Sequence, residues 1–172
     1  WGAGNDAQLG YGNQFSIGDD ETPATNPVSG GIVQLPGGQP VLSVTAGHGH
    51  TCALLGDASL ACWGNGGNGQ LGYGNTDIIG DDETPVANPV NGGAVPLPGG
   101  QTAVAVTAAD SYTCAILTGG QTTCWGYGGI GQLGYGNGND IGDNELIGNN
   151  PVNGGLVRLP GPDRVVEVTT GY

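Results

Sequence analysis

The sequence repeats itself with a period of 62 residues, and this periodicity constrains the fold more than any other feature. Trp1, Trp63 and Trp125 each open a glycine-rich stretch that ends in Gln-Leu-Gly-Tyr-Gly-Asn. The repeat units are residues 1–62, 63–124 and 125–172, and the third unit ends where its hairpin is expected. Self-similarity at a fixed period is typical of repeat architectures. We therefore interpret the chain as one array of a single structural unit.

Each unit contains short segments rich in Val, Leu and Thr that are separated by glycine and proline. Such segments, without any helical periodicity, predict strands. The expected strands are 32–35, 41–46, 50–55 and 59–63, then 94–97, 103–108, 112–117 and 122–125, then 156–159 and 165–170. Four short strands per unit are typical of a propeller blade. We expect an all-β fold of about three four-stranded β-propeller blades in an incomplete ring, with the last hairpin missing.

The charge balance excludes several classes of partner. The net charge is -13, with 15 acidic residues against two basic ones, Arg158 and Arg164. Nucleic-acid binding requires cationic side chains that neutralise phosphates, so a nucleic-acid partner is not expected. No apolar run approaches the roughly 20 residues that a transmembrane helix needs, so membrane insertion is not expected either.

The four cysteines form two pairs with the same spacing. Cys52 and Cys62 flank one glycine-containing turn, and Cys114 and Cys124 flank another. In an antiparallel hairpin centred on each turn, the two cysteines lie directly opposite each other, which permits a disulfide. Buried free thiols and zinc are the alternatives, although the spacing lacks the Cys-x-x-Cys pattern of zinc sites. Disulfides would indicate an oxidising compartment outside the cytosol.

An acidic loop in each unit is the sharpest candidate site. It concentrates oxygen ligands in a glycine-rich loop, and calcium binds six to eight oxygens in flexible loops of this kind. The spacing does not match the EF-hand, and Asp also caps turns through its own backbone. Calcium is thus a possible cofactor, although none is required. The candidate ligands are Asp19, Asp20, Glu21, Asp81, Asp82, Glu83, Asp143 and Glu145.

Large apolar residues recur at identical places in the three units. Aromatic residues at one repeat position more often pack between blades than form a sugar-binding surface, because each carries a large apolar area. We expect Trp1, Trp63, Trp125, Leu9, Leu71 and Leu133 to form the repeat core. Tyr11, Tyr73 and Tyr135 belong either to this core or to a stacking surface for sugars.

Two motifs that suggest chemistry have simpler interpretations. Gly-x-Gly-x-x-Gly occurs at 67–72 and 129–134, but Tyr-Gly-Asn follows instead of the helix that a dinucleotide site requires. These glycines are expected to form tight turns. His48 and His50 have no accompanying nucleophile motif such as Gly-x-Ser-x-Gly, so catalysis is not supported and we expect no catalytic residues.

The pattern His-Thr-Cys-Ala-Leu, Cys-Trp-Gly and Gly-Gln-Leu-Gly-Tyr-Gly resembles the repeat of the regulator of chromosome condensation family. The resemblance covers the whole chain and implies a β-propeller, usually of seven blades. It also implies a structural role for the histidine beside Thr51, which is His50. This chain departs from the family in its long units, its cysteine pairs and its number of blades. Its acidic insert and its cysteines resemble those of secreted bacterial members more than those of nuclear eukaryotic ones.

These observations favour a non-enzymatic structural or adhesive protein, extracellular or at the cell surface. We expect it to self-assemble head to tail with other copies through the incomplete blade, giving a ring or a filament. The alternative is a fragment of a larger binding propeller that docks a protein or a glycan on one face. Nucleotide exchange on a small GTPase, an activity that the resemblance implies, ranks third.

Overall fold

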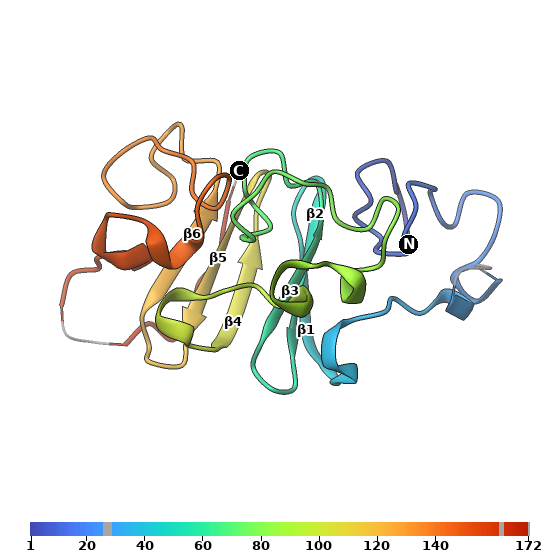
Figure 1. Ribbon diagram of the computed structural model, residues 1–172, viewed down its shortest axis with the longest axis horizontal. Coiled ribbons are helices and arrows are strands. Elements are labelled where there is room, and N and C mark those ends of the chain that lie inside the picture. The colour runs from blue at the N-terminus through green and yellow to red at the C-terminus, as the bar shows by residue number, and fades with distance from the viewer. Residues whose placement is uncertain (26–28, 162–163, 172) are drawn as a thin grey trace.

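The computed structural model describes residues 1–25, 29–161 and 164–171, which contain two antiparallel three-stranded sheets (Figure 1). The first sheet contains β1 (Val41–Ala46), β2 (His50–Leu55) and β3 (Leu60–Gly64), and the second contains β4 (Ala103–Ala108), β5 (Tyr112–Leu117) and β6 (Thr122–Gly126). These residues include no α-helix, which confirms the all-β prediction. The short 3-10 helices are η1 (Pro23–Thr25), η2 (Ser29–Gly31), η3 (Pro36–Gly38), η4 (Pro85–Ala87), η5 (Val90–Gly93), η6 (Pro98–Gly100), η7 (Ile147–Asn149) and η8 (Asn153–Gly155). No helix among the described residues has the length and apolarity needed to cross a membrane.

The two sheets have the same register, as expected for repeats of one unit. In each sheet the first strand is bulged near its start, and the second and third strands form a regular hairpin. Cys52 lies opposite Cys62 and Cys114 lies opposite Cys124, with Cα atoms 4.1 Å apart in both pairs. Both pairs form disulfides, which confirms the bonds predicted from the spacing.

The outermost strand of each predicted blade is reduced to a single ladder contact. Segment 94–97 is irregular, and only the Val95 amide bonds to the first sheet, at the Leu60 carbonyl 2.8 Å away. In segment 156–159 the Val157 amide makes the matching bond to Thr122, at 2.9 Å. A proline ends each of these segments, as it ends 32–35, and Pro96 lacks the N–H that would extend the ladder. The four-stranded blade is therefore three strands plus one pinned segment.

Tyrosine hydroxyls replace the missing ladder at this outer edge. The Tyr73 hydroxyl lies 3.1 Å from the Cys62 carbonyl and 2.9 Å from the Gly93 carbonyl, and it accepts the Cys62 amide. Tyr135 joins Cys124 to Gly155 in the same way. Tyr11, Tyr73 and Tyr135 are all buried, so they are not the sugar-stacking surface considered above.

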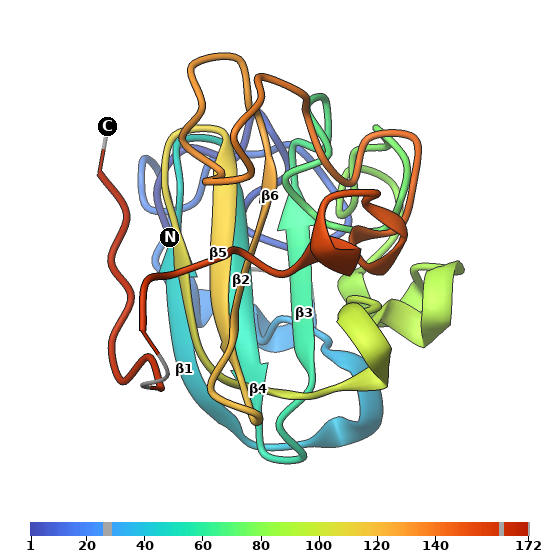
Figure 2. The same cartoon turned by 90° about the vertical axis from the view of Figure 1, so that its left-hand side faces the viewer.

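The structural blades are offset in sequence from the repeat units. Each complete blade runs from an inner strand to the pinned segment of the following unit, which gives 41–97 and 103–159. Residues 165–171 lie beside β4 and β5, joined by Thr170 to Thr107 at 2.9 Å and by the Tyr112 hydroxyl to the Gly171 carbonyl at 3.3 Å (Figure 2). The strand predicted at 165–170 is not formed, because no ladder of hydrogen bonds joins it to β4.

Successive units are joined through the main-chain carbonyl of one glutamine. Trp125 Nε1 and Thr113 Oγ1 both donate to the Gln70 carbonyl, each at 2.9 Å. One unit earlier, Trp63 and Thr51 donate to the Gln8 carbonyl in the same way. Because the glutamine belongs to the glycine-rich turn, this pair of bonds anchors each blade to the turn that precedes it.

The packing residues predicted from the repeat differ in burial. Trp63 and Trp125 are 4% and 0% exposed, and Leu71 and Leu133 are also buried. Leu9 is half-buried. Trp1 contradicts the expectation, because it is 85% exposed. Its counterparts Trp63 and Trp125 each donate to a turn 55 residues earlier in the chain.

We expect Trp125→Phe to lower the free energy of unfolding by about 2–3 kcal/mol, because it removes a buried hydrogen bond and leaves a cavity. Urea denaturation measures the change. Trp1→Phe is the matched control at the same repeat position, and because that ring is exposed its effect should stay below about 0.5 kcal/mol. Equal losses in the two variants would contradict the different burial of these tryptophans.

Candidate functional site

The loops gather on one side of the molecule, and the hairpin turns lie on the other (Figure 1). We call the first side the loop face; it is formed by residues 2–21, 47–49, 65–84, 109–111 and 127–145. The opposite hairpin face carries the turns at 56–59 and 118–121. The loop face thus holds the acidic loops, both glycine-rich motifs and His48.

Acidic side chains concentrate on the loop face. Its carboxylates belong to Asp6, Asp19, Asp20, Glu21, Asp77, Asp81, Asp82, Glu83, Asp110, Asp140, Asp143 and Glu145. Both arginines lie toward the hairpin face: the Arg164 stem lies against Gly120, and Arg158 follows Val157, whose amide bonds to Thr122. The described part of the chain therefore has a strong charge asymmetry between its two faces.

The glycine-rich turns position the acidic loops. Gly69 adopts a φ of +78°, and a Cβ at this residue would collide with the backbone of Gly142 and Asp143. The Gly74 amide bonds to the Gly142 carbonyl at 3.1 Å. The acidic loop of the third unit therefore rests on the turn of the second, and that of the second lies against the turn of the first, where Gly80 approaches Ala7 and Gly10. No helix follows the Gly-x-Gly-x-x-Gly motif at 67–72, so it lacks the geometry of a dinucleotide site.

The structure brings together two of the three predicted calcium clusters. The carboxylates of Asp19, Asp20 and Glu21 lie within 4.8 Å of one another, as do those of Asp81, Asp82 and Glu83. Asp143 and Glu145 do not form a third such group in the described structure. Their loop carries Asn144 at the position of Asp82, so it has one carboxylate fewer.

Crowding of carboxylates alters their titration. A hydrogen bond and negative charge from Asp20 raise the pKa of Glu21. Burial, together with Asp82, raises the pKa of Glu83. Burial and the charge of Asp143 raise the pKa of Glu145. Burial and neighbouring negative charge both disfavour the ionised carboxylates of these glutamates, whereas a bound cation would favour them.

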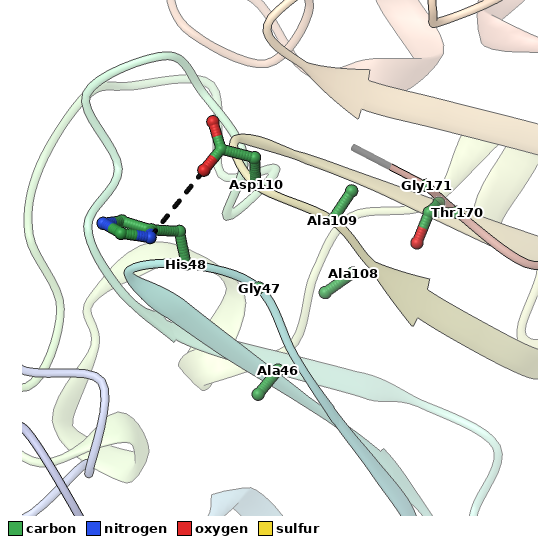
Figure 3. Close-up of a pocket in the computed structure, with 8 residues that line it drawn as sticks. All are labelled: Ala46, Gly47, His48, Ala108, Ala109, Asp110, Thr170 and Gly171. Carbon is green, nitrogen blue, oxygen red and sulfur yellow. Dashed lines mark ion pairs between the residues drawn. The ribbon is translucent and has the colours of Figure 1, made fainter.

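His48 and Asp110 lie where the inner strands reach the loop face (Figure 3). The His48 Nδ1 atom is 3.9 Å from Asp110 Oδ1, and both side chains are exposed. The Ser111 hydroxyl donates to Asp110 Oδ2 at 3.2 Å instead of to the imidazole. The base therefore does not activate this serine, and the arrangement is not that of a hydrolytic triad.

His50 is buried and forms a hydrogen bond between the two blades. Thr113 Oγ1 donates its proton to Gln70, so His50 Nε2 must donate to Thr113, at 2.9 Å. This assigns the neutral tautomer with a bare Nδ1, an atom that is buried and has no hydrogen-bond partner. Burial lowers the pKa of His50 to about 4, although the charge of Asp110 opposes the shift. The structural role expected for His50 fits this geometry.

The sequence is similar to known repeat proteins. The sequence matches the Regulator of chromosome condensation (RCC1) repeat over residues 1–54 and, in a second description of that repeat, over residues 41–70. The human E3 ubiquitin-protein ligase HERC2 is 28% identical over 136 residues, which is 79% of this chain and 2% of that protein. The ultraviolet-B receptor UVR8 of Arabidopsis thaliana is 34% identical over 102 residues, which is 59% of this chain and 21% of the receptor.

Solved structures support the propeller fold. Human WBSCR16 superposes with a TM-score of 0.61 at 18% identity, over 98% of this chain and 36% of that one. Prp20p from Saccharomyces cerevisiae gives 0.54 at 21% identity, over 87% of this chain and 34% of that one. The chain thus spans about a third of each of these propeller structures. It has the architecture of consecutive propeller blades, which confirms the predicted fold.

We expect the buried His50 to make stability depend on pH. Above its ordinary pKa of 6.5 the imidazole is neutral in both states, and its contribution is fully present. Between about pH 6.5 and pH 4 only the unfolded chain takes up the proton, which lowers the free energy of unfolding by about 3 kcal/mol. Urea denaturation of the wild type and His50→Gln across this range measures the difference. The variant should lose this pH dependence and the exposed-site control His48→Gln should keep it; the reverse would contradict the assignment.

Calcium binding by the two carboxylate clusters stays a prediction. Sites of sub-millimolar to millimolar affinity would give, at 5 mM calcium, about 1–2 kcal/mol of stabilisation and a rise of about 2–4 °C in Tm. The double variant Asp81→Asn/Glu83→Gln should reduce the rise. An unchanged Tm, or an equal rise in sodium chloride of matched ionic strength, would contradict calcium binding.

Proposed function

Because the chain carries repeats of the regulator of chromosome condensation (RCC1) family, we propose that it is a non-enzymatic, protein-binding segment of a β-propeller. Its loop face would receive a positively charged segment of a partner protein. Prp20p, which shares the fold, has binding properties to Gsp1p and histones, so a propeller of this kind can bind other proteins. For the present chain, we infer the class of partner from the charge of its own surface.

The charge asymmetry between the two faces carries this proposal. The loop face gathers twelve carboxylates, whereas Asp57 and the two arginines lie toward the hairpin face. Charge complementarity steers association and selects partners more than it adds affinity. A face without lysine or arginine repels acidic partners and attracts basic ones. Exposed loops at the ends of rigid strands are also where proteins commonly place binding residues.

The comparisons favour a binding propeller over the self-assembling adhesive protein that the repeat pattern first suggested. They match the chain to part of longer propellers and give no support for association between copies. Self-association is therefore an outcome to test and not part of this proposal. The bacterial origin stays a prediction from the sequence.

We place the protein outside the cytosol. Its two disulfides persist in oxidising compartments and are rare in the cytosol. Both bonds link buried positions of neighbouring strands, so that oxidation cross-links the two strands of one hairpin in each blade. This feature supports an extracellular or cell-surface location.

Charge reversal on one face tests the proposed function. Asp82→Lys on the loop face and Glu167→Lys beside the inner strands each replace one exposed carboxylate and alter the net charge equally. Binding of an octapeptide of alternating arginine and serine, followed by isothermal titration calorimetry at low salt, should weaken about 3–10-fold for Asp82→Lys and less than about twofold for Glu167→Lys. Equal effects, or no binding by the wild type, would contradict the proposal, and light scattering detects any self-association.

A further inference from the structure

Three equivalent segments enclose a hollow on the loop face. Residues 46–48, 108–110 and 170–171 follow one another at the 62-residue period, and each lies at the loop-face end of an inner segment. Together they line a cavity of about 250 Å³ (Figure 3). The walls are small side chains, and His48 and Asp110 lie at its rim. This volume is below the range of about 300–1,000 Å³ that is usual for small-molecule sites, so the hollow suits a single side chain.

The hollow is rigidly built. The His48 amide donates to the Asp110 carbonyl at 3.3 Å, which joins the two loops across the blade boundary. A Cβ at Gly47 would collide with the Ala109 carbonyl and the His50 ring, so only glycine permits this close approach. Within each loop, Gly47 and Ala109 bond back to the carbonyls of His50 and Tyr112, both at 2.9 Å. The cavity is therefore present before any ligand arrives.

A second, polar hollow adjoins the first. It has a volume of about 200 Å³ and shares His48 and Asp110 with the first hollow, and it adds Asp6, Asn65 and Ser111. Asn65 Nδ2 donates to Asp6 Oδ1 at 3.2 Å and Ser111 donates to Asp110 Oδ2, so each carboxylate is held by one oxygen. Asp110 Oδ1 faces the His48 nitrogen at 3.9 Å, which is too long for a hydrogen bond. A free carboxylate oxygen therefore lies at the boundary of the two hollows.

We propose that the joined hollows bind one arginine side chain of the partner, a site that rests on the protein-binding function proposed above. The aliphatic stem lies on Ala46, Ala108 and Ala109, and the guanidinium reaches Asp110 and Asp6. Long cationic side chains bury their stems on apolar surface while the charged head reaches polar groups. Arginine fits better than lysine, because its planar fork of donors satisfies carboxylates on two sides at once.

The test is an NMR titration of the whole chain with Nα-acetyl-arginine amide. Its uncharged isostere, Nα-acetyl-citrulline amide, is the control ligand. We expect saturable shifts at the backbone amides of His48, Ala109 and Asp110 with arginine and none with citrulline. Equal shifts with both ligands, or arginine shifts confined to the acidic loops 19–21 and 81–83, would overturn the proposal.

Two matched pairs of variants separate the pocket from the general charge of the face. Asp110→Asn should weaken arginine binding about tenfold, as expected for the loss of one charged hydrogen bond, whereas Asp82→Asn should weaken it less than about twofold. Ala46→Leu fills the cavity from an exposed position and should abolish binding, whereas Ala87→Leu on η4 should not. Unchanged binding in Ala46→Leu would refute the pocket. If Asp82→Lys still weakened binding of the octapeptide in that case, the proposed function would stand without the arginine pocket.

Discussion

The structure depends on a single carbonyl group in each repeat. Gln70 accepts hydrogen bonds from Thr113 and Trp125, so both lone pairs of one buried oxygen join two blades. A carbonyl with two buried donors fixes the angle at which the next blade packs, because neither donor has another partner available. The glycine-rich turn around Gln70 holds this oxygen in place, and the same turn supports the following acidic loop. Scaffold and surface therefore share one fixed point per repeat.

The repeats share their scaffold residues but differ in side chains at the loop face. The scaffold positions occupied by Thr, Cys, Trp and Gln are the same in successive units, whereas His48 in one unit becomes Asp110 in the next. The buried neighbour varies as well, since His50 is replaced by Tyr112. The repeat therefore supplies similar sites around the loop face, and substitution at one position gives each site its own chemistry. Fold alone does not specify that chemistry.

Features that depend on local pairing could be predicted from the sequence. The hairpins, the register of Cys52 with Cys62 and the burial of Trp125 follow from spacing and periodicity within neighbouring units. The outer segment at 94–97 was wrongly expected to be a strand, because apolar composition does not reveal that a proline and a tyrosine hydroxyl replace the ladder. The hollow beside His48 was not foreseen, since it forms between residues 62 positions apart. The period itself was the signal that could have found it.

The tyrosine that closes the outer edge of each sheet also affects the tendency of these molecules to aggregate at high concentration. A bare third strand would present a row of unpaired amides and carbonyls, which is a template for joining sheets of different molecules. Tyr73 and Tyr135 instead occupy the carbonyls of Cys62 and Cys124 and draw an irregular segment over each edge. The rim is thereby capped by side chains that cannot propagate a ladder. Consecutive blades rich in β-structure can thus be displayed at high concentration without templating fibrils along this edge.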